Sequence, residues 1–227
     1  MLSKPIPTWI LISGLTLTCC AGCINAVGFL GVHHQALSHM SGTGTIFSTE
    51  LVSRQYEAAW HALLVLAFFL MGCVLSGIIV RHNTLQLGRR YGVALSCEST
   101  LLFSATYFLR HDSNQGDYLA AMACGLQNAM ATSYSGAVIR TTHITGLITD
   151  LGIALGLALR GDAVDLRRIG LFLVLVSGFI LGGILGGIGY LHLGVDTLLF
   201  PATVTGIAGI TYALFTHFQR GAVLPSA

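Results

Sequence analysis

Two groups of small polar residues interrupt a largely apolar chain, and their chemistry suits the recognition of a small polar solute. They consist of His39, Ser41, Gly42, Thr43 and Thr45 in the first group, and of Thr142, His143, Thr145, Gly146 and Thr149 in the second. Hydroxyl and imidazole groups donate and accept hydrogen bonds, and a glycine lets a substrate or another backbone approach closely. We expect both groups to bind substrate.

Three side-chain amides extend this candidate site. Asn25, Gln127 and Asn128 fall inside apolar segments, where an amide is costly unless it is paired. We expect them to line the same interface as the hydroxyl groups. A hydrogen bond between two helices, without a ligand, is the alternative explanation.

Three of the nine acidic residues also lie well inside apolar segments. Carboxylates in such positions usually belong to ion or proton pathways. Asp150 ranks first as a coupling group, because the positive start of a helix at Thr145 would stabilise its charge. Glu98 ranks second and Glu50 third, with a purely structural role as the alternative for these two.

The sequence gives no reason to expect metal binding, a cofactor or catalysis. His39 and His143 could titrate near neutral pH, but no further pair has the spacing of metal ligands, so we predict neither a metal nor a cofactor. The six cysteines lie in apolar segments and are interpreted as packing residues. The chain contains no His-Glu-x-x-His and no Gly-x-Ser-x-Gly motif, and we therefore do not expect an enzyme.

Composition identifies the elements that must position these residues. The 227 residues are 54% apolar and 9% charged, whereas soluble domains are about 25% charged. This excludes a soluble protein and predicts a single membrane domain over residues 1–227, with the lipid bilayer as its surroundings. A net charge of +2 gives no reason to expect a nucleic-acid partner.

Six apolar runs approach the ~20 residues that a helix needs to cross a bilayer. They cover residues 8–32, 60–80, 91–109, 117–136, 169–191 and 197–217. Two shorter runs cover residues 41–52 and 145–159. At 1.5 Å per residue these correspond to helices of about 18 and 22 Å, too short to cross a hydrocarbon core of about 30 Å.

The two halves of the chain resemble each other over residues 8–109 and 117–217. Gly22 and Asn25 recur as Gly125 and Asn128, His39 and Gly42 as His143 and Gly146, and Phe69 and Gly72 as Phe179 and Gly182. Chance matching of small and apolar residues is the alternative to a duplication. Faces of small residues predict close helix packing at Gly72, Ser76, Gly77, Gly178, Gly182, Gly183, Gly186 and Gly187.

The distribution of positive charge favours an inverted repeat. If the short segments enter the membrane and return, nine of the 11 Lys and Arg residues are cytoplasmic, against seven if the short segments cross. We therefore predict an all-α integral membrane protein with six transmembrane helices and two re-entrant half-helices, arranged as two inverted three-span repeats. Both termini would be cytoplasmic, and the starts of the half-helices would approach each other near the bilayer midplane.

Several of these motifs resemble the YoaK family of bacterial multi-pass membrane proteins, which is domain of unknown function 1275. The resemblance rests on Asn25-Ala26, Ser38-His39-Met40-Ser41-Gly42-Thr43-Gly44-Thr45, Gly125-Leu126-Gln127-Asn128-Ala129 and Thr141-Thr142-His143-Ile144-Thr145-Gly146-Leu147-Ile148-Thr149-Asp150-Leu151-Gly152. Asn25 replaces the Asp that is common in the family, and Ser41 replaces a Thr. The resemblance implies location in the bacterial inner membrane and implies no substrate.

These features together predict a small-solute secondary transporter or channel of the cytoplasmic membrane. Its site would lie between the two half-helix starts, with coupling to protons or cations. Because the chain is small, a sealed gate could require a second copy of it as a partner. A non-transporting membrane scaffold or a lipid-interacting protein is the alternative.

Overall fold

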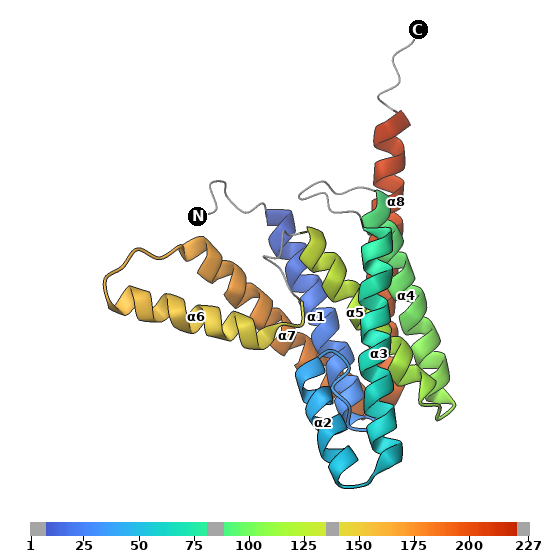
Figure 1. The fold of residues 1–227 in the computed structure, drawn as a ribbon. Helices are drawn as coiled ribbons and strands as arrows, with labels where there is room; N and C mark the ends of the chain where they lie inside the picture. Colours follow the sequence, from blue (N-terminus) through green and yellow to red (C-terminus); the bar gives the residue numbers. More distant parts are fainter. Residues whose placement is uncertain (1–7, 81–88, 135–140, 222–227) are drawn as a thin grey trace.

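Helices make up most of the described chain. The computed structural model describes residues 8–80, 89–134 and 141–221 (Figure 1). Its helices are α1 (Thr8–Leu30), α2 (Met40–Val52), α3 (Tyr56–Ile79), α4 (Arg89–Arg110), α5 (Gln115–Tyr134), α6 (Ile144–Leu159), α7 (Leu166–Leu193), the short 3-10 helix η1 (Gly194–Leu198) and α8 (Leu199–Gly221). No strand occurs within the described ranges, and the predicted all-helical class is confirmed.

Four stretches of the described chain are long and apolar enough to cross a membrane. They are Leu11–Leu30, Tyr56–Ile79, Arg90–Arg110 and Leu166–Leu214. The last stretch contains α7, η1 and most of α8, and its 49 residues would make about 73 Å of helix, more than twice the ~30 Å of a bilayer core. The fifth helix, α5, is not among these stretches, and it carries Asp117, Gln127 and Asn128.

The outer surface of the long helices is strongly apolar. Side chains that are about half exposed or more include Leu70, Met71, Val74 and Ile78 on α3, and Leu173, Ile180, Leu181, Ile184, Leu185 and Ile188 on α7. Soluble monomers rarely expose contiguous apolar patches of this kind. Such a surface suits contact with lipid chains, as expected for a membrane protein.

The helices of the two halves pair crosswise. The main contacts join α1 to α7, α3 to α5 and α4 to α8, while α2 lies along α3 and α6 lies along α7. The repeat matches α1 with α5 and α3 with α7. The contact of α1 with α7 is therefore equivalent to the contact of α5 with α3. The first long helix of each half thus packs against the third helix of the other half.

Glycines permit this crosswise pairing. A side chain at Gly22 would collide with the backbone of Phe179, and one at Gly125 with the backbone of Phe69. In the same way Gly182 faces Cys19, and Gly72 faces Met122. The predicted close packing is confirmed at Gly72, Gly178, Gly182 and Gly186. It is wrong for Gly77, which has open space where a side chain would lie, because this residue faces away from α5.

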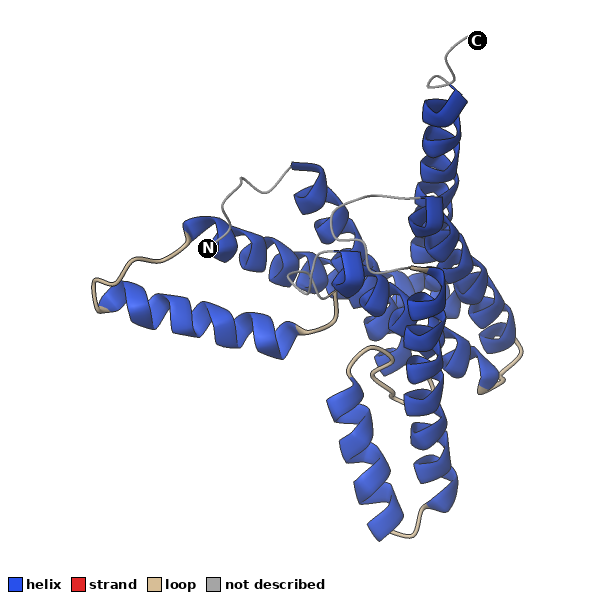
Figure 2. Ribbon diagram, turned by 45° about the horizontal axis from the view of Figure 1, so that its top comes forward, coloured by secondary structure: helices blue, strands red, loops and turns tan. Residues whose placement is uncertain are grey.

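The two short helices begin near the centre of the molecule and run outward (Figures 1 and 2). They contain 13 residues in α2 and 16 in α6. Their bounds agree with the two short apolar segments of the sequence. Their starts bring the two predicted groups of polar residues toward each other.

Candidate functional site

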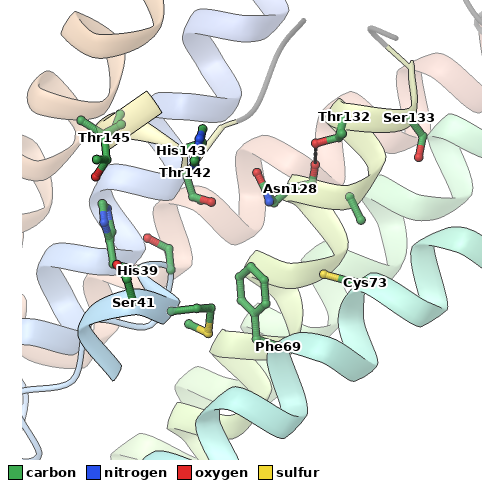
Figure 3. A pocket seen from close by; sticks show the side chains of 14 residues that line it. His39, Ser41, Phe69, Cys73, Asn128, Thr132, Ser133, Thr142, His143 and Thr145 are labelled. Atoms are coloured by element: carbon green, nitrogen blue, oxygen red, sulfur yellow. Dashed lines mark hydrogen bonds between the residues drawn. The ribbon is translucent and has the colours of Figure 1, made fainter. Parts of the chain in front are cut away.

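A cavity of about 620 Å³ lies between the starts of α2 and α6 and the neighbouring parts of α3 and α5 (Figure 3). Its lining combines hydroxyl, imidazole and amide groups with a few apolar side chains. The lining residues are Ser38, His39, Met40, Ser41, Phe69, Cys73, Asn128, Ala129, Thr132, Ser133, Thr142, His143, Ile144 and Thr145. Six of the predicted substrate-binding residues are therefore brought together here: His39, Ser41, Asn128, Thr142, His143 and Thr145.

Each short helix starts at a histidine. His39 and His143 are the N-cap residues, and neither side chain makes a capping hydrogen bond. Their carbonyl oxygens instead accept the first helical hydrogen bonds, from the N–H of Gly42 at 3.0 Å and from that of Leu147 at 3.1 Å. The starts of both helices, with their partial positive charge, therefore adjoin the same cavity.

The ring of His39 is held at the edge of the cavity by Phe179. Their ring centroids are 5.2 Å apart in an edge-to-face arrangement. The Nε2 atom of His39 is buried and has no hydrogen-bond partner among the residues that the structure describes. A buried polar atom without a partner costs about 1–3 kcal/mol, so this nitrogen is ready to bind a ligand or water. Phe69, the repeat counterpart of Phe179, itself lines the cavity.

The ring of His143 lies over the first turn of its own helix. A side chain at Gly146 would collide with Cδ2 and Nε2 of this ring, whereas Gly42 in the other half has open space around it. Neither glycine lines the cavity. The lack of a side chain at Gly146 thus leaves room for the ring of His143, and substrate contact by the two glycines stays a prediction.

The two equivalent asparagines have different environments. Asn128 lines the cavity, and its buried Oδ1 atom has no hydrogen-bond partner. Oδ1 of Asn25 instead accepts hydrogen bonds from the backbone N–H of Ser38 at 3.2 Å and from its hydroxyl at 3.0 Å. Asn25 therefore positions the segment that leads into α2 and does not line the cavity.

Four other predicted residues make hydrogen bonds within the protein, outside the cavity lining. The buried hydroxyl of Thr43 donates to the carbonyl of Ala36 at 3.0 Å. Thr45 and Thr149 donate to the carbonyls four residues earlier in their helices, at 3.0 and 2.9 Å. Gln127 is fully buried and donates from Nε2 to Oε1 of Glu98 at 2.9 Å. These hydrogen bonds account for the three threonine hydroxyls without a ligand, whereas the buried Oε1 atom of Gln127 has no partner among the described residues.

The three candidate coupling acids do not line the cavity. Asp150 is 45% exposed and lies 3.8 Å from Nη2 of Arg168, beside a separate cavity of about 200 Å³. Glu98 is fully buried, with Gln127 as its hydrogen-bond partner. Glu50 is partly buried, and its Oε2 atom has no partner among the described residues.

The sequence did not predict the apolar wall of the cavity. Phe69, Cys73 and Met40 contribute to it, and the Cys73 thiol donates to the carbonyl of Gly125 at 3.3 Å. Phe69 could have been found from the repeat, because its counterpart Phe179 contacts the histidine of the other half. Thr132 and Ser133 follow Asn128 by one helical turn, and this spacing was the available signal for them.

Comparison with known proteins identifies a family. The family described as "Protein of unknown function (DUF1275)" matches residues 13–211. Neither a search of the curated proteins nor a search of the solved structures finds a match. The family match includes the starts of both short helices and nearly all of the helical fold. The chain therefore belongs to the DUF1275 family, as the motifs around His39 and His143 predicted.

Proposed function

We propose that the chain is a transporter or channel for a small solute. The observation that carries this proposal is the cavity of about 620 Å³ at the starts of α2 and α6, lined by six of the polar residues that the sequence singled out. Ligand cavities generally have volumes of about 300–1,000 Å³.

In this proposal the two halves are inverted repeats, each with three spans and one re-entrant half-helix. The crosswise pairing of α1 with α7 and of α3 with α5 supports the repeat. The paired glycine contacts support it further, because Gly22 and Gly125 occupy equivalent positions against Phe179 and Phe69. The inversion rests on the distribution of Lys and Arg, which places the N- and C-termini in the cytoplasm.

The cavity favours a solute that carries hydrogen-bond acceptors. Two helix starts direct partial positive charge toward it, and hydroxyl groups of Ser41, Thr142 and Thr145 add donors. None of the residues lining this cavity is acidic. We infer that the substrate class is a small anion or a small carbonyl compound.

Asp150 remains the first candidate for the residue that couples solute movement to protons or cations, and its ion pair with Arg168 is the contact through which it would act. Both side chains are about half exposed, and exposed pairs of this kind contribute only about 0–1 kcal/mol. Apolar contacts among Leu147, Leu171 and Phe172 also hold α6 against α7, so a cation that acts at Asp150 would alter only this ion pair. Coupling in this form needs no contact between Asp150 and the solute.

The experiment is solute flux into proteoliposomes that contain the purified chain. Isotope uptake is measured for a panel of inorganic anions and short monocarboxylates, with the wild type, His143→Ala and His192→Ala. His192 is exposed at the end of α7 and serves as the control. We expect uptake by the wild type and the control, and a loss of tenfold or more with His143→Ala. Uptake equal to that of empty liposomes for the whole panel would contradict the proposal.

A further inference from the structure

Three metal-ligating side chains meet outside the cavity described above. His33 follows the end of α1, His61 lies in the second turn of α3, and Asp117 lies in the first turn of α5. Their ligand atoms all lie within 4.8 Å of one another. The three residues are far apart in the sequence, and no spacing motif could have predicted the cluster.

Two distances within the cluster are close to those between ligands of one ion, and the shorter of them is also a hydrogen bond. Nδ1 of His33 lies 2.9 Å from Oδ2 of Asp117, and Nε2 of His61 lies 3.3 Å from the same oxygen. Ligand atoms on a tetrahedral zinc ion, with bonds of about 2.0–2.1 Å, lie about 3.3 Å apart. Little rearrangement is needed to admit an ion.

His61 is oriented as a metal-ligating histidine usually is. Its Nδ1 atom lies 3.0 Å from the hydroxyl oxygen of Tyr118. Its Nε2 atom is buried, lies 3.3 Å from Oδ2 of Asp117 and has no hydrogen-bond partner within the described part of the chain. The hydrogen-bond roles of the ring depend on its tautomer. In the tautomer that carries the proton on Nδ1 and donates it to Tyr118, the lone pair on Nε2 faces a negative oxygen. That arrangement is unfavourable unless a cation lies between them.

The burial of the cluster strengthens this argument. The side chains of His61 and Asp117 are each only 6% exposed, whereas that of His33 is 33% exposed. A buried carboxylate needs a compensating positive charge, and a divalent ion held by both histidines would supply it. The exposed side of His33 provides a route by which the ion enters.

We propose that His33, His61 and Asp117 form a binding site for a divalent transition-metal ion, with Zn²⁺ as the best match. Two imidazoles and one carboxylate are a common protein ligand set for zinc, and they leave a coordination position for water. Tyr118 is a positioning residue that orients His61. The ion would join the end of α1 to α3 and α5, and thus connect the two halves of the chain.

The test is zinc binding to the full-length protein in detergent, with no affinity tag. Titration calorimetry with Zn²⁺ alone as the probe should give one ion per chain. Asp117→Asn and His61→Ala should each weaken binding by at least a hundredfold, and Tyr118→Phe by about 10–100-fold. His34→Ala is the matched control and should bind as the wild type does, because His34 contacts the carbonyl of Phe29 and lies outside the cluster.

Cobalt substitution of the wild-type protein gives an answer that does not depend on the folding of a variant. The Co²⁺ spectrum should show the visible bands of a site with nitrogen and oxygen ligands, without a thiolate charge-transfer band. A thiolate band would assign the ion to the cysteines and overturn the proposal. So would a wild-type protein that binds no Zn²⁺, or binding that survives in folded His61→Ala and Asp117→Asn proteins.

Discussion

The ring of His143 lies over the start of α6 only because residue 146 has no side chain. In the other half, Gly42 has open space and permits a methyl group. The two equivalent glycines therefore have different roles, and one substitution at each position separates them.

Gly146→Ala should displace the His143 ring and reduce solute uptake about tenfold or more, while the fold is retained, since the colliding atoms belong to a movable side chain. Gly42→Ala should leave uptake within about twofold of the wild type. Uptake into proteoliposomes and thermal denaturation of both variants check this prediction. Equal uptake by the two variants would show that the position of the His143 ring is unimportant.

A second prediction at the residue scale concerns the buried pair Glu98 and Gln127. Gln127→Leu removes the donor that lies 2.9 Å from Oε1 of Glu98. A fully buried carboxyl group then loses its hydrogen bond, and the free energy of unfolding should fall by about 1–3 kcal/mol. Replacing both residues by Leu should restore most of this loss, because neither polar side chain of the pair is then left buried without the other.

Denaturation of Gln127→Leu, Glu98→Leu and the double variant in detergent measures the coupling between Glu98 and Gln127. If the effects of the single variants simply add, the hydrogen bond contributes nothing to stability. Glu98 would then need another explanation, such as the coupling role that the sequence suggested.

At the scale of elements, the crosswise helix pairs depend on residues that bring two backbones into contact. Gly72 faces Met122 on α5, and its counterpart Gly182 faces Cys19 on α1. A methyl group at either position meets backbone atoms, which cannot move as a side chain can. Because the geometry is the same at both positions, a methyl group should destabilise the protein at both.

Gly72→Ala and Gly182→Ala should each lower the free energy of unfolding by about 1–3 kcal/mol or more, through overpacking. Gly77→Ala on the same helix as Gly72 is the control, and it should change stability little because nothing lies within 4 Å of the added carbon. Thermal denaturation in detergent compares the three variants. A large loss of stability for only one of the two packed glycines would argue against equivalent packing in the two halves.

At the scale of the whole molecule, the inverted repeat makes a prediction about sidedness. The connection between α2 and α3 and the connection between α6 and α7 occupy equivalent positions in the two halves. In an inverted arrangement they lie on opposite sides of the membrane. A reporter fused near Glu57 should be external, and one near Asp162 cytoplasmic. If both reporters lie on the same side, the repeats are parallel.

The sequence predicted the elements and the location of the cavity better than it predicted the direction of individual side chains. Apolar runs placed the helices α1 to α8, though not the short 3-10 helix η1, and the repeat brought the regions around His39 and His143 together. The rotation of a helix about its axis depends on its packing partners, so Thr45, Thr149 and Asp150 could not be placed in advance. The cluster at His33 depends on three distant segments, and only the fold reveals it.

Access of water to the starts of α2 and α6 tests the central claim most directly. Single cysteines replace Ser41, Thr145 and, as a lipid-facing control, Val74 in a protein whose native cysteines have been removed. A membrane-impermeant thiol reagent is then applied from each side. We predict reaction at Ser41 and Thr145 and none at Val74. Protection of both cavity positions from both sides would contradict a solute-binding cavity.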